Sequence, residues 1–82
     1  MSTTAERTRA VIADQAGCNV AQVADDKHLH GDLSLDSLDR YELTMALEDE
    51  FGIRIPDEEA DQLKTVGEIV GLVKSKVNGG AV

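Results

Sequence analysis

Apolar residues recur every three or four positions along most of this chain, which is the spacing of one face of an α-helix. The pattern breaks at Gly17, Gly52 and Pro56, residue types that commonly end helices or follow their ends. Almost nothing in the chain alternates as a strand would. The pattern therefore predicts an all-α fold, a small antiparallel bundle of three main helices, at residues 3–16, 37–51 and 66–77, with one short helix at 57–62.

The segment between the first two predicted helices lacks a helical period. Residues 17–35 are rich in Asn, Asp, His and Gly, and their isolated apolar residues are Val20, Val23, Leu29 and Leu33. We expect a long structured loop that contacts the core at those apolar positions. The whole chain, residues 1–82, is predicted to be a single domain, with disordered ends at residues 1–2 and 79–82.

The second predicted helix has two apolar stripes on opposite sides. At about 100° per residue, one stripe consists of Leu43, Leu47 and Phe51, and the other of Leu38, Tyr41 and Met45. A small bundle can bury only one of them, and the wider first stripe is expected to face the core. The second stripe is then exposed among carboxylates, as at a surface that docks a partner protein. The alternative is that its members are scattered surface residues without a role.

Length and cysteine content restrict the chemistry. A chain of 82 residues has a small core and little room for an enclosed active site. Cys18 is the only cysteine, which excludes an internal disulfide and a cysteine-rich zinc site. We expect Cys18 to be a small apolar side chain buried in the core. The sequence contains no signal-peptide pattern and no apolar run near the ~18 residues that a membrane span needs. We expect a soluble, cytoplasmic domain that does not insert into membranes.

Negative charge is concentrated in the middle of the chain, between residues 32 and 61. The net charge is −8, and residues 32–61 contain eleven acidic side chains and two basic ones. Such a surface repels nucleic acid and anionic lipid headgroups, and it attracts basic protein surfaces. Binding to nucleic acid is therefore not expected. A basic protein partner is one explanation of the acidic surface, and solubility alone is the other.

Ser37 begins the second predicted helix directly after Asp36, which is expected to cap that helix. A catalytic serine needs an imidazole and an oxyanion hole, but this segment lacks the glycines of a nucleophile elbow, and its carboxylates would oppose an oxyanion. His28 and His30 are accompanied only by carboxylates, so we expect neither catalysis nor a metal site. Ser37 is then either an ordinary helix-start residue or the acceptor of a covalent phosphate group, which the free amides of a helix start favour.

The segment DLSLDSLDRYELTMALEDEFGIRIPDEEADQLKTV resembles the acyl carrier protein family of dissociated, type II fatty acid synthases. The similarity extends to AERTRAVIADQAG near the start and to the closing EIV segment, and so covers nearly the whole chain. In this family the serine of the Asp-Ser-Leu motif carries 4'-phosphopantetheine. The resemblance implies that Ser37 is the covalent attachment site and that Asp36 is the acidic residue important for the phosphopantetheinyl transferase.

The resemblance also implies a carrier without catalytic activity. The thiol of the flexible arm forms thioesters, so a monomeric domain would present growing or finished acyl chains to separate enzymes of fatty acid or related lipid synthesis. These enzymes would be a ketosynthase, reductases, a dehydratase and acyltransferases with basic docking surfaces. A pocket between the three main helices would shelter the chain. Two alternatives stay open: a specialised carrier for polyketide, peptide or unusual lipid synthesis, and a non-carrier acidic module that regulates a partner.

The expected partner-binding residues lie on the second helix and just beyond it. The docking positions implied by the resemblance are Leu38, Glu42, Met45 and Glu48. The other expected members, on the same acidic surface, are Asp39, Tyr41, Asp49, Asp57 and Asp61. A surface of this kind gives weak, fast and reusable binding to several basic partners.

Arg40 departs from the family pattern. It lies toward the core side of the second helix, between Leu43 and Phe51, where an unpaired buried guanidinium would cost several kcal/mol. We expect it to extend outward or to pair with Asp36, one turn earlier, while its aliphatic stem fills the mouth of the groove between helices. Tyr41 departs as well, since it replaces a smaller aliphatic residue, and both changes favour the specialised-carrier alternative.

Overall fold

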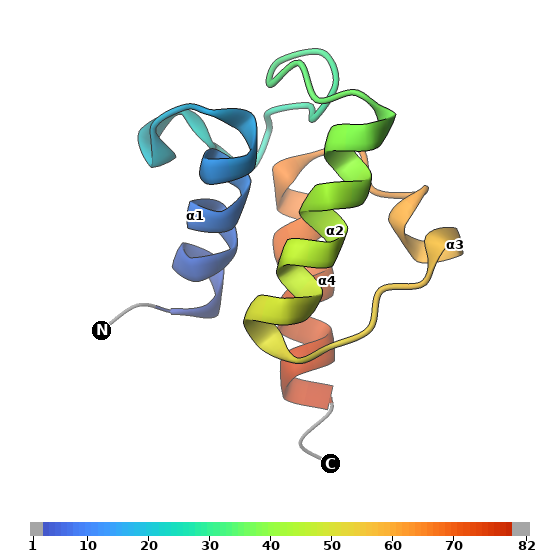
Figure 1. Cartoon of the computed structure of the whole chain (residues 1–82). Helices are drawn as coiled ribbons and strands as arrows, with labels where there is room; N and C mark the ends of the chain where they lie inside the picture. Colours follow the sequence, from blue (N-terminus) through green and yellow to red (C-terminus); the bar gives the residue numbers. More distant parts are fainter. Residues whose placement is uncertain (1–2, 80–82) are drawn as a thin grey trace.

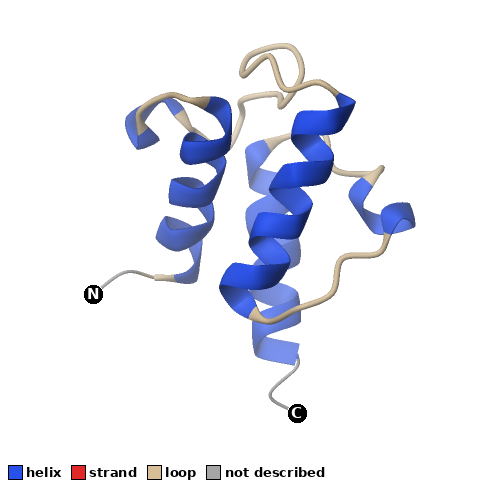
Figure 2. Cartoon of the chain, viewed as in Figure 1, coloured by secondary structure: helices blue, strands red, loops and turns tan. Residues whose placement is uncertain are grey.

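The computed structural model describes residues 3–79. Its elements are α1 (Thr4–Ala16), the 3-10 turn η1 (Val20–Gln22), α2 (Ser37–Phe51), α3 (Asp57–Ala60) and α4 (Val66–Gly79). Figure 1 shows α1, α2 and α4 side by side and the short α3 set apart from them. Helices and loops, but no strands, make up the described residues (Figure 2). The all-α prediction is confirmed.

The main helices do not all alternate in direction. α1 runs antiparallel to both α2 and α4, which themselves run in the same direction (Figure 1). The connection of residues 52–65, which contains α3, makes this possible because it returns the chain to the end of the bundle where α2 began. The antiparallel expectation therefore holds for α1 against each of the other two main helices.

Local signals determine where the first helices begin and end. The Thr3 hydroxyl accepts a hydrogen bond from the Glu6 N–H at 3.1 Å, and the Glu6 carboxylate accepts one from the Thr3 N–H at 2.8 Å. The bond from the Thr3 N–H lowers the pKa of the Glu6 carboxyl. Gly17 caps the end of α1 and Gly52 the end of α2, with φ values of 70° and 65° that glycine adopts without strain. The predicted ends of both helices are confirmed.

The last helix is longer than predicted. α4 continues to Gly79, past the predicted end at Val77 and into the segment that was expected to be disordered. Residues 72–78 contain no proline or glycine, so the helix has no local stop signal before Gly79. The other residues of the expected disordered ends, 1–2 and 80–82, lie outside the described part of the chain.

Glu68 caps the start of α4. Its Oε1 accepts hydrogen bonds from the backbone N–H groups of Lys64 at 2.8 Å and Thr65 at 2.9 Å, and the Thr65 hydroxyl accepts one from the Glu68 N–H at 3.3 Å. The bond from the Lys64 N–H, followed by that from Thr65, holds the pKa of Glu68 below its ordinary value of 4.5. The ionised carboxylate therefore stabilises the folded state.

This pKa shift predicts the pH dependence of one variant. Since the folded-state pKa is the lower one, the contribution of Glu68 is complete above about pH 4.5 and is lost as the pH falls through the folded-state pKa. Glu68→Gln should be less stable than wild type at neutral pH, and the difference should shrink in acid, as measured by urea unfolding at several pH values. The exposed Glu58→Gln is the matched control. Equal stability differences at all pH values would contradict the prediction.

The core lies between α1, α2 and α4. Its most deeply buried apolar residues are Ile12, Leu35, Leu43, Leu47, Val66, Ile69 and Val73. Leu43 and Leu47 confirm that the wider stripe of α2 faces inward. Phe51 is only partly buried against the core, and the Arg7 guanidinium lies over its ring at 4.6 Å from the centroid. Arg7 also forms an ion pair with Glu50 at 2.8 Å, which joins α1 to the end of α2.

The loop between α1 and α2 is anchored as expected at most of the predicted positions. Its buried residues are Val23, Leu29 and Leu35. Val20 is 52% exposed, so its predicted role as an anchor is wrong: it begins η1, which leaves its side chain in solvent, and Leu35 is buried instead. The Leu29 N–H donates to the Lys64 carbonyl at 2.9 Å, which ties the loop to the segment before α4. Cys18 is partly buried against the core.

Candidate functional site

Ser37 is the exposed first residue of α2, and its neighbours cap the helix without it. Asp36 Oδ1 accepts a hydrogen bond from the Asp39 N–H at 2.8 Å, and Asp39 Oδ2 accepts one from the Asp36 N–H at 3.3 Å. The predicted cap at Asp36 is confirmed. The Ser37 hydroxyl makes no hydrogen bond within residues 3–79, so it is not required to begin the helix.

Two backbone donors beside the Ser37 hydroxyl are open. The N–H groups of Asp39 and Arg40 are bonded to Asp36, at 2.8 and 2.9 Å, whereas those of Ser37 and Leu38 have no hydrogen-bond partner within the described residues. Open N–H groups and the helix dipole both favour an anion at a helix start. A phosphate group on Ser37 would lie next to these donors.

Within the described residues, no imidazole is bonded to Ser37 as a general base would be. The His30 ring nitrogen Nδ1 lies 3.2 Å from the Leu35 carbonyl oxygen, and the His28 backbone N–H donates to Asp32 at 2.7 Å. Neither imidazole forms a hydrogen bond with Ser37 in the described chain. No group of three or more His, Cys, Asp or Glu side chains in the described residues is placed to hold a metal ion. The arrangement suits an acceptor of a covalent group better than a nucleophile.

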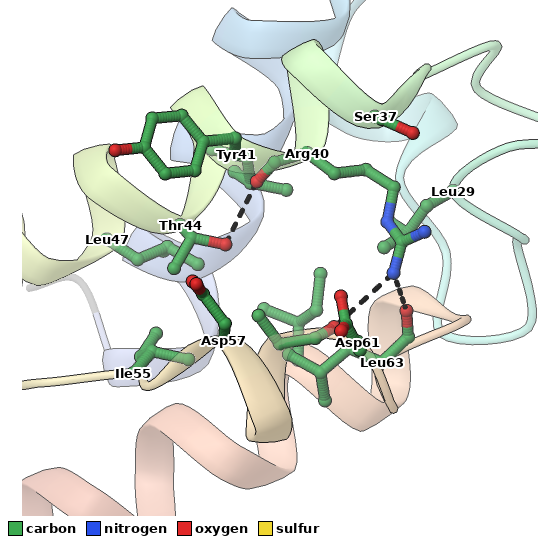
Figure 3. A pocket seen from close by; sticks show the side chains of 13 residues that line it. Leu29, Ser37, Arg40, Tyr41, Thr44, Leu47, Ile55, Asp57, Asp61 and Leu63 are labelled. Atoms are coloured by element: carbon green, nitrogen blue, oxygen red, sulfur yellow. Dashed lines mark hydrogen bonds between the residues drawn. The ribbon is translucent and has the colours of Figure 1, made fainter.

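A cavity of about 250 Å³ lies beside Ser37, between α2 and the connection that contains α3 (Figure 3). Its polar lining residues are Ser37, Arg40, Tyr41, Thr44, Asp57 and Asp61. Its apolar lining residues are Leu29, Leu43, Leu47, Ile55, Ala60, Leu63 and Ile69. None comes from α1, so the expected pocket between the three main helices is wrong: α1 packs directly against α2 and α4, and the space lies under α3 instead.

Arg40 reaches from α2 across this cavity to the opposite wall (Figure 3). Its Nη2 donates to the backbone carbonyls of Leu63 at 3.0 Å and Ala60 at 3.3 Å. The expected ion pair with Asp36 is wrong, because the Asp36 carboxylate accepts from the Asp39 N–H at the start of α2 while the Arg40 guanidinium donates to the carbonyls of Ala60 and Leu63. No ion pair to Arg40 occurs within residues 3–79. The predicted position of its stem, along the groove, agrees with the structure.

The second stripe of α2 is exposed, as predicted. Leu38, Tyr41 and Met45 are 64%, 58% and 48% exposed, whereas Leu43 and Leu47 on the opposite side are 2% and 1% exposed. Three large apolar side chains on successive turns of one helix form a continuous strip that we call the apolar strip. Tyr41 lies both on the strip and at the cavity, so the two features adjoin.

The carboxylates around the apolar strip are not equivalent. Glu42 is exposed and accepts a hydrogen bond from Gln15 Nε2 at 3.0 Å. Glu48 is partly buried, and its Oε2 accepts a hydrogen bond from the Ile55 N–H at 2.7 Å, which holds the connection of residues 52–65 against α2. This structural contact was not predicted, because the partner lies beyond the end of the helix. The only sequence feature that points to the contact between Glu48 and Ile55 is Pro56, which favours an extended conformation of the residue before it.

Most of the acidic residues in residues 32–61 have no ion-pair partner in the described chain. The exceptions are Glu50, paired with Arg7 at 2.8 Å, and Glu59, paired with Lys76 at 2.7 Å. Asp39 is partly buried in the cap of α2, and the remaining predicted partner-binding carboxylates, Asp49, Asp57 and Asp61, are exposed. Their negative charge is therefore available to a partner.

An exposed serine at a capped helix start, beside a partly apolar cavity, is an arrangement suited to a domain that carries a covalently attached group. Residues 6–73 match the protein family described as "Phosphopantetheine attachment site". The chain belongs to this family, and its relatives place it among the acyl carrier proteins. Its site residues suit the group, because the serine, the open amides and the cavity adjoin one another.

Two relatives support this assignment. The chain is 46% identical over 72 residues to an acyl carrier protein of Thermosynechococcus vestitus, a match that covers 88% of this chain and 89% of the relative. It is also similar to a solved structure from Mycobacterium tuberculosis that is assigned as an acyl carrier protein. That structure has a TM-score of 0.82 and 32% identity, over 88% of this chain and 96% of the other. No helix within residues 3–79 is long and apolar enough to cross a membrane.

Proposed function

We propose that Ser37 carries 4'-phosphopantetheine through a phosphodiester on its Oγ. The observation that supports this proposal is an exposed serine hydroxyl, free of hydrogen bonds within residues 3–79, beside the open N–H groups of Ser37 and Leu38. Asp36 fixes the first turn of α2 and so holds these donors in place. When bound, the prosthetic group supplies a thiol that forms thioesters with acyl chains.

The domain holds growing or finished acyl chains and presents them to enzymes of fatty acid or related lipid synthesis. Its own residues bind and shelter the chain: the apolar lining of the cavity, including Leu47 and Ile55, is placed to cover the acyl carbons near the thioester. We favour a fatty acid pathway over polyketide or peptide synthesis because α2 is dense in carboxylates and is followed by the IPDEEA segment. It stays a prediction that the protein is cytoplasmic and monomeric and that it binds neither nucleic acid nor membranes.

The proposed partners are the phosphopantetheinyl transferase, which would approach Ser37 and Asp36, and synthase enzymes with basic surfaces. Each synthase enzyme would place apolar side chains on the apolar strip and Lys or Arg side chains beside Glu42 and Asp49. Such contacts are weak individually and accelerate association, which suits a carrier that must leave each enzyme after one step.

Intact mass spectrometry tests the proposed function. The purified protein is incubated with coenzyme A and a phosphopantetheinyl transferase, and its mass should increase by one phosphopantetheine group. Fragmentation should place the group on Ser37. A protein that stays unmodified with transferases of several kinds would favour the non-carrier acidic module instead. The thioesters found on protein purified from the native organism would then identify the pathway.

Charge reversal at Glu42 should slow the use of this carrier by a partner enzyme. Glu42→Lys is expected to lower kcat/KM about tenfold at low salt, because a rim charge acts mainly on the association rate, and the difference should shrink as salt is added. Glu58→Lys on α3 makes the same charge change outside the expected docking set and is the control. Glu48→Lys is a poor test, because it also removes the acceptor for the Ile55 N–H.

Two outcomes would count against electrostatic docking at this surface. One is an equal loss of kcat/KM in the Glu42 and Glu58 variants, which would mean that only net charge matters. The other is a wild-type kcat/KM that does not change between low and physiological ionic strength.

A further inference from the structure

Arg40 stands between two hollows in the surface. The cavity beside Ser37 has a volume of about 250 Å³, and a second cavity of about 230 Å³ lies toward the loop that contains His28 and Gly31. The two share the lining residues Leu29, Arg40 and Leu63. These three residues form the boundary between the cavities, and Arg40 is the charged residue among them.

Hydrogen bonds hold this boundary in place. The Arg40 guanidinium spans from α2 to the carbonyls of Ala60 and Leu63, so it closes the space between α2 and the segment that follows α3. The two carbonyl oxygens partly stabilise the positive charge of the guanidinium in the absence of a carboxylate. Displacing the guanidinium would break both hydrogen bonds. The side chain is partly buried, and it therefore acts as a fixed wall in the groove.

The cavity beside Ser37 suits an acyl chain, whereas the Arg40 side chain at its boundary does not. Toward α2 and α4 the lining includes Leu43, Leu47 and Ile69, which suit the methylene groups of an acyl chain. A chain that reached Arg40 would meet a charged group with its donors directed across the groove, and desolvating that group without a new partner is unfavourable. An acyl chain is therefore sheltered only up to the length at which its end meets Arg40.

We infer that Arg40 sets the length of the acyl chain that this carrier can bury. The inference rests on the proposed attachment of the arm at Ser37. Short and medium chains fit on the Ser37 side of the wall, and a longer chain cannot advance far enough to draw its thioester out of water. The long-chain thioester is thus left open to solvent and to partner enzymes.

Thioester cleavage by hydroxylamine tests this inference. Wild type and Arg40→Ala are loaded with butanoyl, octanoyl and dodecanoyl groups, loading is verified by mass, and cleavage rates are measured. Opening the wall should let the long chain continue into the second cavity. Burial of one or two further methylene groups would slow cleavage of the dodecanoyl thioester about tenfold in the variant. The butanoyl thioester, whose end does not reach Arg40, should be cleaved at the wild-type rate.

The control variants separate the wall from other effects. Arg54→Ala removes the same charge from an exposed residue that lines neither cavity, and it should match wild type at every chain length. Arg40→Lys keeps a long stem and one donor group, and it should stay close to wild type. If Arg40→Ala does not fold, Arg40→Gln, which is shorter but keeps an amide donor, should show a smaller change in the same direction.

Three outcomes would overturn the inference. Equal cleavage rates in wild type and Arg40→Ala at all lengths would mean that the side chain forms no barrier. A uniform change at all lengths would mean that the substitution merely loosens α3. Failure of both proteins to load would overturn the proposed function itself, and with it this inference, whereas loading followed by equal rates overturns the inference alone.

Discussion

Replacing Ser37 with alanine should abolish modification by the phosphopantetheinyl transferase while leaving the fold intact. The hydroxyl oxygen is the only atom on which the proposed phosphodiester can form, so the loss should be complete. Stability should change by less than about 1 kcal/mol, because Ser37 is exposed and the cap of α2 is provided by Asp36. Intact mass measures the modification, and circular dichroism with urea unfolding measures the fold.

Ser75→Ala on α4 is the matched control for this variant. Ser75 is also exposed and helical, so its substitution should leave both the modification and the stability unchanged. A mass increase in the Ser37 variant would move the attachment site elsewhere. Loss of helical structure in the Ser37 variant would mean that the serine has a structural role that its exposure does not suggest.

Leu47→Ala should change stability and Met45→Ala should change partner binding, although the two residues lie only two positions apart. Leu47 is 1% exposed, and its truncation leaves a space in the core, so the free energy of unfolding should fall by about 2–5 kcal/mol. Met45 is 48% exposed on the apolar strip, and its truncation should change stability by less than about 0.5 kcal/mol. Met45→Ala should instead raise the KM of a partner enzyme severalfold, because it removes part of the docking surface.

Urea unfolding and steady-state kinetics on the two proteins distinguish these effects. The Leu47 variant should be assayed at a temperature at which unfolding measurements show it to be folded, and its KM should then be close to wild type. Strong destabilisation of the Met45 variant would mean that Met45 has a structural role. A partner-enzyme KM equal to that of wild type would mean that Met45 is not part of a docking surface.

The features that were predicted correctly depend on neighbours in sequence. The ends of α1 and α2 follow from Gly17 and Gly52, whose positive φ is a local property, and the cap at Asp36 involves a residue three positions away. The two faces of α2 follow from helical geometry alone, since one helix in a small bundle can bury only one of them. Ser37 as the attachment site stays a prediction, which is implied by the resemblance of the Asp-Ser-Leu motif to the acyl carrier protein family.

The features that were missed depend on residues far apart in sequence. Arg40 donates to the carbonyls of Ala60 and Leu63, about twenty positions later, and Glu48 accepts from Ile55 beyond the end of α2. Neither contact can be derived from a helical wheel, because both depend on where the connection of residues 52–65 lies in space. The position of the cavity was mispredicted for the same reason.

That connection is fastened to the bundle mainly by side chains. Arg40 and Glu48 hold it from α2, Lys76 holds Glu59 from α4, and Ile55 anchors it in the core, while α3 itself packs little against the main helices. Releasing such tethers exposes much less apolar surface than unfolding the core, so this segment can open as a separate cooperative unit at a lower free energy. Entry and exit of an acyl chain would then need only this local opening. The rate of cargo exchange and the global stability of the carrier are consequently set by different residues, and one can change without the other.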